Sequence, residues 1–346
     1  MKKIILHIVV TATLLFTVTG SLFSQGQQVT DIDGNYYNIV TIGSQVWMLE
    51  NLRTTKYNDG TAIIPAADYT PNTGTYSYYE NDILNKPIYG ALYNWYAVNT
   101  GKLCPSGWHV PNVAEWTELT DYLGGQSMAG GKMKEAGYDH WLAPNTGATN
   151  ESGFDALPGG QGTTTFYSKG EYAYFWSSEY DNTYSYYLQL VNNSATGGIT
   201  GYTTKDHGFS VRCIEDDPRI VTNTDDNGMG SLRNALEYAN STVAVKETIT
   251  FNIPGEGPFT IKLSAPLPPI TDPIVIDGYT QPGASAANSI LLIELDGTGA
   301  GADQLSNGLT ISADNCIVKG LVINQFSQNG ILINSAEGNT IVGNYI

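Results

Sequence analysis

Basic residues are scarce in this chain. Its 346 residues include 16 Lys and Arg against 33 Asp and Glu, which gives a formal net charge of -17. Nucleic acid and anionic membrane surfaces repel such a protein, so neither is expected as a partner. Charged residues make up only 14% of the chain, whereas 23 Tyr and 38 Gly are present. This composition is typical of β- and loop-rich binding modules, and it is compatible with neutral glycans, proteins or calcium as ligands.

Recognised catalytic motifs are missing as well. The sequence contains no HExxH, no Gly-x-Ser-x-Gly elbow, no phosphate-binding loop and no CxxC pair. The four histidines are scattered along the chain. His109, which follows Trp108, is predicted to be structural and satisfied by backbone groups. An enzyme is therefore the less favoured prediction.

Long apolar runs are confined to the N-terminus. Lys2 and Lys3 precede a mostly apolar stretch from Ile4 to Val18, and small residues follow. This order is typical of a secretory signal peptide, so residues 1–25 are predicted to be removed on export to the cell surface or medium. A membrane anchor is the alternative, but the run is short for one. No later segment is apolar enough to be a transmembrane segment.

Cysteine is rare, with three residues in the chain. In an exported protein we predict a disulfide between Cys104 and Cys213, closing a loop of roughly a hundred residues and stabilising by roughly 4 kcal/mol in the chain-entropy model. Two buried free thiols are the alternative. Cys316 is predicted to be a small, buried apolar side chain.

The clearest local signal lies between Leu103 and Gly125. Asn112 and Glu115 form a predicted capping box at the start of a helix, and Gly124 ends it. The apolar face of this helix would comprise Val113, Trp116, Leu119, Tyr122 and Leu123. A second helix is predicted over residues 91–101, and a loop-rich region from Gly130. Strands are predicted over residues 36–41 and 45–49 as a hairpin, 172–180 and 185–191 as a pair, and 208–214 as a half-buried closing strand.

Seven motifs in this order resemble the Fibrobacter succinogenes major paralogous domain, a family common in secreted proteins of Bacteroidetes and Fibrobacteres. They are DIDGNYY, IGSQVWMLENLRTTKYNDGT, YNWYAV, LCPSGWHVPNVAEWTELTDYLGG, GATNESGFDALPGG, FWSSEY and GFSVRCIED. The resemblance implies an α+β C-type lectin-like domain over residues 26–216, with a long irregular loop. It implies binding at the cell exterior and little about activity.

Two sets of side chains are candidates for ligand binding. The lectin-like fold implies that Asn150, Glu151 and Asp155 in the long loop hold calcium through oxygen atoms. The sugar-binding tripeptides of calcium-dependent lectins are absent, and the alternative is that Asn150 and Asp155 form turns. No cofactor other than calcium is expected. The second set, Tyr172, Tyr174, Tyr184 and Tyr186, either stacks on sugar rings or packs a strand pair.

Composition changes after Asp217, where Ile, Val, Asn and Gly replace aromatic residues. A helix is predicted over residues 231–240, with Ser231 as N-cap, and strands over 248–253, 259–263, 273–278 and 290–297. The motif NGLTIS at Asn307 recurs as NGILIN at Asn329, and NCIV at Asn315 recurs as NTIV at Asn339. These steps of about 22 and 24 residues indicate coils of a parallel β-helix.

The GSLRNAL segment resembles the opening of exported right-handed β-helix proteins of the polymorphic outer-membrane type, from which it departs at Gly230 and Asn234. The resemblance implies an all-β right-handed parallel β-helix over residues 217–346, with the helix capping its first coil. The predicted inward residues are Leu309, Ile311, Cys316, Val318, Leu321, Ile323, Ile331, Ile333 and either Ile341 or Val342. The chain stops at Ile346 in an incomplete coil. This ending favours a fragment of a longer protein over a last coil that frays or pairs with a second molecule.

The sequence thus predicts an exported, non-enzymatic surface or extracellular protein. Its lectin-like module would bind a glycan or protein ligand and would be displayed on the β-helix, in a role such as adhesion. A polysaccharide lyase or hydrolase acting through the β-helix face is one alternative, because Asp272, Asp277, Glu294 and Asp296 are available there. Asp277 and Asp296 each precede Gly, which favours turns instead. A purely structural spacer is the other alternative.

Overall fold

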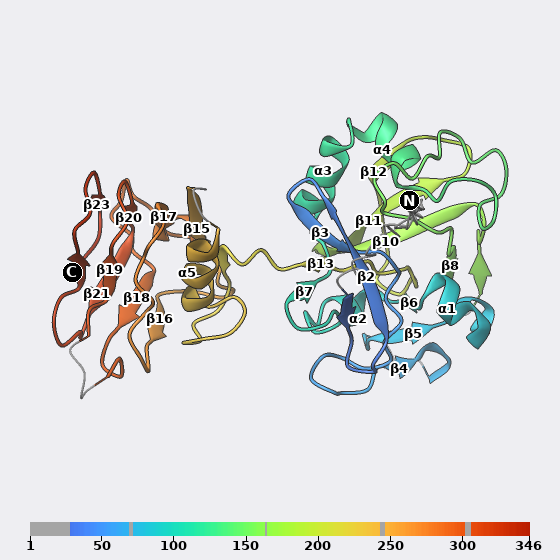
Figure 1. The fold of residues 1–346 in the computed structure, drawn as a ribbon. Coiled ribbons are helices and arrows are strands. Elements are labelled where there is room, and N and C mark those ends of the chain that lie inside the picture. Colours follow the sequence, from blue (N-terminus) through green and yellow to red (C-terminus); the bar gives the residue numbers. More distant parts are fainter. Residues whose placement is uncertain (1–27, 69–71, 163–164, 243–245, 302–305) are drawn as a thin grey trace, which may run out of the picture.

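The computed structural model describes residues 28–68, 72–162, 165–242, 246–301 and 306–346. The protein is mostly β-sheet with few helices (Figure 1). Buried hydrophobic side chains of the described residues form three clusters, and each cluster lies entirely before or entirely after residue 217. We call residues 28–216 the N-terminal region and residues 217–346 the C-terminal region. The predicted signal peptide lies outside the described residues.

Antiparallel pairing dominates the larger sheets of the N-terminal region. One sheet has the strand order β1-β2-β3-β13-β7, and another has the order β10-β11-β12. The bounds are β1 Gln28–Thr30, β2 Tyr36–Ile42, β3 Gln45–Met48, β7 Trp108–His109, β10 Tyr172–Asp181, β11 Tyr184–Val191, β12 Gly197–Thr203 and β13 Ile214–Glu215. The predicted hairpin β2–β3 and strand pair β10–β11 are confirmed. The prediction missed β12, whose glycines hide any apolar alternation.

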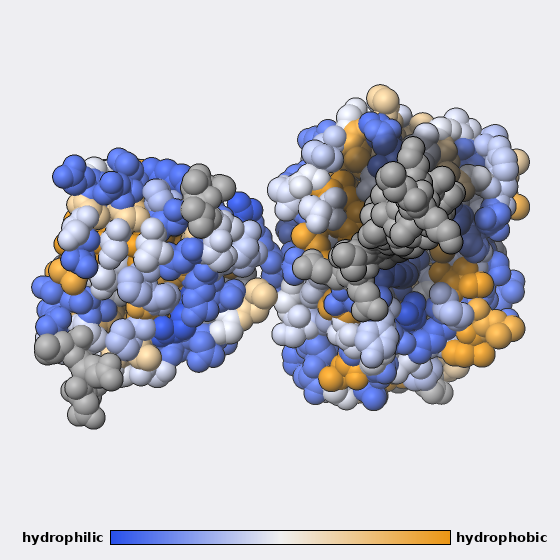
Figure 2. All heavy atoms as spheres, viewed as in Figure 1, coloured by the Kyte–Doolittle hydropathy of each residue, from blue (hydrophilic) through white to orange (hydrophobic). Residues whose placement is uncertain are grey.

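Shorter elements complete this region. They are β4 Ile64–Pro65, β5 Thr75–Ser77, β6 Leu92–Tyr93, β8 Gln161–Gly162, β9 Phe166–Tyr167, the 3-10 helices η1 Ala66–Asp68, η2 Tyr79–Asn81 and η3 Ile83–Asn85, and the helix α1 Lys86–Tyr89. On the face seen in Figure 2 the surface is predominantly hydrophilic, with hydrophobic residues in separate patches. Ile83, Leu84 and Ile88 of η3 and α1 are among the exposed hydrophobic side chains.

Helix α3, Val113–Tyr122, begins and ends as predicted. The Asn112 side chain accepts from the Glu115 backbone N–H, and the Glu115 carboxylate accepts from the Asn112 N–H, so the capping box is present. Gly124 adopts a φ of +99°, the left-handed conformation that favours glycine after a helix. Trp116, Leu119 and Leu123 are buried, whereas Tyr122 is 65% exposed, so its predicted place on the apolar face is wrong.

Two other helix predictions are corrected. The helix predicted over residues 91–101 is only one turn, α2 Trp95–Val98, because Leu92 and Tyr93 belong to β6. The segment predicted to become loop at Gly130 is the end of helix α4, Gln126–Met133. A Cβ at Gly130 would lie 2.2 Å from the Thr196 carbonyl oxygen, and one at Gly131 would lie 2.4 Å from that of Gly147. These glycines therefore permit close packing against loops and do not signal a break.

The closing segment is extended but buried on both sides. Phe209, Val211 and Cys213 are buried as predicted, and so are Ser210 and Arg212, so the half-buried description is wrong. Isolated bridges replace a continuous strand before β13. The predicted disulfide between Cys104 and Cys213 is confirmed, with a sequence separation of 109 residues.

The C-terminal region consists of a helix and parallel strands. Helix α5, Leu232–Ser241, starts at the N-cap Ser231 and buries its predicted apolar face against the cluster that contains Val221 and Ile249. The strands are β14 Ile220–Val221, β15 Glu247–Phe251, β16 Phe259–Lys262, β17 Ile274–Asp277, β18 Ile293–Asp296, β19 Leu309–Ile311, β20 Ile317–Lys319, β21 Leu321–Asn324, β22 Ile331–Ile333 and β23 Thr340–Val342, with a 3-10 helix η4 Gly278–Thr280. They form three parallel sheets with the orders β14-β15-β17-β20-β23, β16-β18-β21 and β19-β22.

The sequence repeat predicts most of this register. Leu309 pairs with Ile331, a step of 22 residues, and the Asn329 side chain donates to Asn307 Oδ1 at 2.9 Å. Ile317 pairs with Thr340, a step of 23, so the predicted step of 24 is wrong by one residue. Val318 then pairs with Ile341, which settles the open alternative in the last coil.

Burial in the C-terminal region follows the prediction until its last strands. Leu309, Ile311, Cys316, Val318, Leu321 and Ile323 are buried as predicted. Cys316 has a free thiol, also as predicted. Ile331 is half-buried and Ile333 is 44% exposed, so their full burial is not observed. Among the described residues, no helix has the length and apolar character needed to cross a bilayer.

Candidate functional site

The sheet β10-β11-β12 presents its predicted tyrosines on two different faces. Side chains of successive strand residues point to opposite faces. Tyr184 and Tyr186 therefore share a face with Leu188 and Leu190, which belong to the cluster around Trp116. Tyr172 and Tyr174 share the opposite face with Trp176, which belongs to another cluster. The four residues thus do not form one site.

The two pairs differ in the exposure of one tyrosine each. Tyr174 is 8% exposed, and its ring is stacked between those of Tyr172 and Phe209. By contrast, Tyr184 lies at the surface with 37% exposure. Tyr174 is therefore buried within the fold, and the partly buried Tyr172 packs against it.

Tyr202 extends the exposed pair. It lies directly opposite Tyr186 in the β11–β12 pairing, and its ring centroid is 4.9 Å from that of Tyr184. Tyr202 is 62% exposed. We call Tyr184, Tyr186 and Tyr202 the tyrosine platform. Sequence reasoning missed Tyr202 because β12 itself was missed, although the preceding strand pair could have suggested a third strand.

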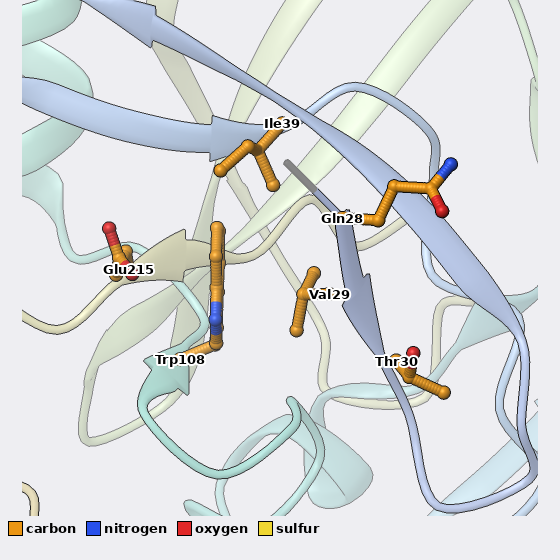
Figure 3. A pocket seen from close by; sticks show the side chains of 6 residues that line it. All are labelled: Gln28, Val29, Thr30, Ile39, Trp108 and Glu215. Atoms are coloured by element: carbon orange, nitrogen blue, oxygen red, sulfur yellow. The ribbon is translucent and has the colours of Figure 1, made fainter. Parts of the chain in front are cut away.

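A groove lies elsewhere in the N-terminal region, between the sheet-edge strand β1 and the strands β7 and β13 (Figure 3). Its volume is about 520 Å³. The lining residues are Gln28, Val29, Thr30, Ile39, Trp108 and Glu215. In Figure 3 the indole of Trp108 stands between Glu215 on one side and Val29 on the other. The groove thus combines an aromatic wall, two aliphatic side chains, two neutral polar side chains and a carboxylate.

Glu215 and Trp108 are direct cross-strand neighbours in the β13–β7 pairing. Residues in this relation have Cβ atoms about 5 Å apart on the same face of the sheet. Partial burial raises the pKa of Glu215, and the nearby charge of Asp216 raises it further. The groove therefore contains a carboxylate whose negative charge is disfavoured by its surroundings.

His109 beside the groove bridges two carboxylates. Its Nδ1 lies 2.6 Å from Asp216 Oδ1, and its Nε2 lies 2.8 Å from Glu115 Oε1. Burial lowers the pKa of His109, but the hydrogen bonds to Asp216 and Glu115 outweigh it and raise this pKa to about 9. The predicted structural role fits this arrangement, but the predicted backbone partners are wrong. His109 joins the start of α3 to the end of β13.

The predicted calcium ligands are engaged with each other and with a lysine. The Asn150 amide donates to Asp155 Oδ1 at 2.8 Å, and the Asp155 backbone N–H donates to Asn150 Oδ1 at 2.9 Å. Glu151 lies 3.3 Å from Lys132 Nζ. Asn150 and Asp155 also have φ values of 50° and 55°, as expected for turn residues. Within the described residues no three His, Cys, Asp or Glu side chains are placed to hold a metal ion.

Two buried cations hold the long loop instead. The fully buried Lys134 ammonium donates to the carbonyl oxygens of Thr146, Val191 and Ser194 at 3.0, 3.0 and 2.9 Å. Burial lowers the pKa of Lys134 to about 8. The buried Arg212 guanidinium donates to the Phe154 carbonyl oxygen at 2.6 Å and to Asn51 Oδ1 at 2.8 Å. Neither cation was recognised from the sequence, because strand alternation placed Arg212 on an exposed face and Lys134 was assigned to a loop-rich region.

The carboxylates of the C-terminal region are used within the chain. Asp277 accepts from the Tyr279 N–H and pairs with Lys319 Nζ at 2.8 Å, while Asp296 accepts from the Thr298 N–H, so both predicted turn roles are confirmed. Asp277 lies on a different sheet from Glu294 and Asp296. Asp272 lies two residues before β17.

Glu294 and Asp296 remain ionised in this setting. Glu294 accepts from Thr260 Oγ1 at 2.6 Å and from the Asn324 amide at 2.8 Å, and these hydrogen bonds lower its pKa. Hydrogen bonds from Thr298 lower the pKa of Asp296. A general acid for glycosidic bonds needs a raised pKa, which neither carboxylate has.

Comparison with protein families gives one match. Residues 40–215 match the model described as the Fibrobacter succinogenes major domain, which covers slightly more than half of the chain. The matched segment contains the tyrosine platform, Trp108 and Glu215. Comparison with curated proteins found no match.

Proposed function

The chain belongs to the Fibrobacter succinogenes major domain family, and on that premise we propose that it is an exported surface or extracellular protein that binds a glycan. The N-terminal region would be a C-type lectin-like module that binds through the tyrosine platform. The observation that carries this proposal is the grouping of Tyr184, Tyr186 and Tyr202 on one face, with two of the rings 4.9 Å apart.

Tyrosine suits sugar recognition for a physical reason. Its ring offers an apolar face to the C–H groups of a sugar, and its hydroxyl remains available for hydrogen bonds. A rigid strand pair holds the side chains of the platform, so little entropy is lost on binding. The chain's charge of -17 disfavours acidic polymers and leaves neutral or cationic glycans.

Export is supported by independent features of the chain. The disulfide between Cys104 and Cys213 is of the kind that persists in oxidising compartments. The N-terminal residues have the order of a signal peptide. Both features agree with a role at the cell exterior.

The C-terminal region would display this module as a right-handed parallel β-helix. Three parallel sheets with stacked strands support the proposal, as do the asparagine contacts between Asn307 and Asn329. Helix α5 would cap the first coil, because its apolar face lies in the same cluster as Val221. The separate hydrophobic clusters before and after residue 217 support domain limits at residues 26–216 and 217–346.

A glycan array probed with the full chain tests the proposal. Tyr184→Ala and Tyr202→Ala should each weaken binding about three- to tenfold, the range expected for one aromatic contact. Tyr138→Ala is the matched control, because Tyr138 is 66% exposed and lies outside the platform. Binding should survive EDTA, because the proposed contacts are made by the aromatic rings of the platform and need no metal ion. Absence of glycan binding, or equal losses with Tyr138→Ala, would contradict the proposal.

A polysaccharide-degrading enzyme acting through the C-terminal region is less well supported. Glu294 and Asp296 lie on one strand, but their lowered pKa values leave no proton donor. Release of reducing sugar or unsaturated product from plant or algal polymers, lost on Asp296→Ala, would favour this alternative over the binding protein.

A further inference from the structure

The N-terminal and C-terminal regions are joined by a short stretch of chain (Figure 1). The last strand of the N-terminal region, β13, ends at Glu215, and the first strand of the C-terminal region, β14, begins at Ile220. Only residues 216–219 lie between these strands, and we call them the junction. The freedom of the two regions to turn relative to each other therefore depends on how the junction is held.

Asp216 is held by the N-terminal region. Its backbone N–H donates to the Gly107 carbonyl oxygen at 2.8 Å, and its carboxylate lies 2.6 Å from Nδ1 of His109. His109 is in turn held by Glu115 at the start of α3, whose carboxylate lies 2.8 Å from Nε2 of the imidazole. Both the backbone and the side chain of Asp216 are thus tied to the N-terminal region.

Asp217 is held by the C-terminal region. Its two carboxylate oxygens accept from the Arg219 guanidinium at 2.9 and 2.7 Å, and Oδ1 also accepts from the Arg219 backbone N–H. The Ile220 N–H donates to the Asp217 carbonyl oxygen, which closes a turn with Pro218 in the position that proline favours. The Arg219 carbonyl oxygen accepts from the Thr250 N–H of β15. The side chain and the backbone of Asp217 are thus tied to the parallel strands.

Few backbone torsions remain free between these two anchors. Proline fixes its own φ, and a residue that precedes proline is restricted to extended conformations, so the turn at Pro218 is stiff. The peptide bond between Asp216 and Asp217 is itself planar. Because Asp216 is fixed on one side of this bond and Asp217 on the other, only ψ of Asp216 and φ of Asp217 are left to change the relative orientation of the regions.

The anchor in the N-terminal region depends on the charge of His109. A neutral imidazole donates one hydrogen bond, whereas the imidazolium donates from both nitrogens. Both ring nitrogens of His109 face a carboxylate oxygen, so both must carry a proton to satisfy Asp216 and Glu115 together. Glu215 is a further acidic group next to Asp216. The pKa of His109, raised to about 9 by the two hydrogen bonds against the effect of burial, agrees with this requirement.

A contact between the two regions lies beside the junction. Met229, in the loop before α5, lies close to Gly107, where an added Cβ would be 3.5 Å from the Met229 Cε. Gly107 is also the residue whose carbonyl oxygen accepts from Asp216. The loop before α5 thus meets the N-terminal region at the turn that holds the junction.

We propose that Asp216 and Asp217 form a two-sided lock that holds the N-terminal and C-terminal regions in one relative orientation. Each carboxylate is bound by a cation of its own region, His109 for Asp216 and Arg219 for Asp217. The lock presents the tyrosine platform at a fixed angle to the parallel strands. It goes beyond the proposed glycan binding and does not depend on which ligand the platform takes.

Distances between two spin labels, measured by double electron–electron resonance on the full chain, test the lock. The labels are attached at Asp121→Cys on α3 and Glu237→Cys on α5, both exposed helical positions. Cys316→Ala removes the free thiol. At neutral pH this labelled chain should give one narrow distance distribution, because the junction leaves few torsions free.

Two substitutions and a pH series should release the lock. His109→Gln and Arg219→Gln should each broaden the distance distribution. His140→Gln should not, and it is the matched control because His140 also contacts a carboxylate, that of Glu135 at 2.8 Å, but no residue of the junction. As pH rises through about 9, the distribution should broaden for the chain with His109 and stay constant for His109→Gln. This comparison separates His109 from Lys134, whose pKa of about 8 lies in a similar range.

Several outcomes would overturn the proposal. They are a broad distribution at neutral pH with the junction intact, equal broadening by His109→Gln and His140→Gln, and a pH response that persists in His109→Gln. Broadening by Met229→Ala without any effect of His109→Gln would assign the orientation to the Met229 contact and contradict the lock. Tryptophan fluorescence checks that each variant is folded, and the pH series decides the question if a junction variant fails to fold.

Discussion

The hydrophobic cores of the two regions of this protein contain different kinds of side chains. The C-terminal cluster is built almost entirely from Ile, Leu, Val and Ala, with Phe251 as its one fully buried aromatic residue among the described residues. The N-terminal clusters are built around Trp47, Trp95, Trp116, Trp141 and Trp176. The N-terminal region also buries the cations Lys134 and Arg212 and carries the disulfide.

The comparison shows which kind of core can be inferred from a sequence. Stacked parallel strands repeat the same apolar alternation at a nearly constant step, so the amino-acid sequence alone shows the pattern. An irregular core depends on individual hydrogen bonds to loop carbonyls, and these have no periodicity.

The difference between the regions also has an experimental use. All six tryptophans, at positions 47, 95, 108, 116, 141 and 176, lie in the N-terminal region. Tryptophan fluorescence therefore reports on that region alone.

Removing the disulfide should have the largest effect, and only on the N-terminal region. The Cys104→Ala/Cys213→Ala variant should lose about 4 to 5 kcal/mol of unfolding free energy, as the chain-entropy model gives for a loop of this length. Denaturant unfolding followed by tryptophan fluorescence measures the loss. Cys316→Ala is the control and should leave the fluorescence transition in place. An equal shift for both variants would mean that the regions do not unfold separately.

Replacing the buried Lys134 with a neutral residue should have the second-largest effect on the free energy of unfolding. Lys134→Met keeps the length of the side chain but removes the ammonium that donates to the carbonyl oxygens of Thr146, Val191 and Ser194, at a cost of about 3 kcal/mol or more. Lys132→Met removes only a partly exposed pair with Glu151 and should cost less than about 1 kcal/mol. Fluorescence-detected unfolding of both variants gives the comparison. Similar losses for the two lysines would show that the long loop is not held by Lys134.

Shortening a side chain in the C-terminal core should lower stability moderately, and tryptophan fluorescence should not detect the change. Ile276 is fully buried between stacked strands, and Ile276→Val should cost about 1 kcal/mol. Circular dichroism should detect the change, while the fluorescence midpoint should stay constant. A shifted fluorescence midpoint would argue for a single cooperative unit.

The smallest effect should be a change in pH dependence at the junction of the two regions. The folded-state pKa of His109 is raised from 6.5 to about 9, so its protonation stabilises fully below pH 6.5 and this contribution is lost as pH rises through 9. His109→Gln should remove this component, so the stability difference between wild type and variant should shrink from pH 6.5 to pH 9. A constant difference across that window would count against the charged bridge to Asp216 and Glu115.

Local signals predicted much of the fold. The capping box at Asn112 and Glu115, the N-cap at Ser231 and the stacking of Asn307 on Asn329 all depend on contacts within a few residues or one repeat. The errors arise where distant segments decide the outcome. Gly130 belongs to a helix because Thr196 packs against it, and Arg212 is buried because Phe154 and Asn51 accept its hydrogen bonds.

The candidate sites were predicted less well for the same reason. Tyrosine count and strand alternation indicated Tyr184 and Tyr186, but the platform is completed by Tyr202 from a strand rich in glycine. Glu215 follows a disulfide cysteine by two residues and had no signal of its own. Its place beside Trp108 arises from the pairing of two strands more than a hundred residues apart.

Hydrogen exchange of the full chain, with and without a bound glycan, tests most directly where binding occurs. The account predicts slower exchange in β11 and β12, residues 184–203, and unchanged exchange in β16, β18 and β21 of the C-terminal region. Protection confined to those C-terminal strands, with none in residues 184–203, would contradict it.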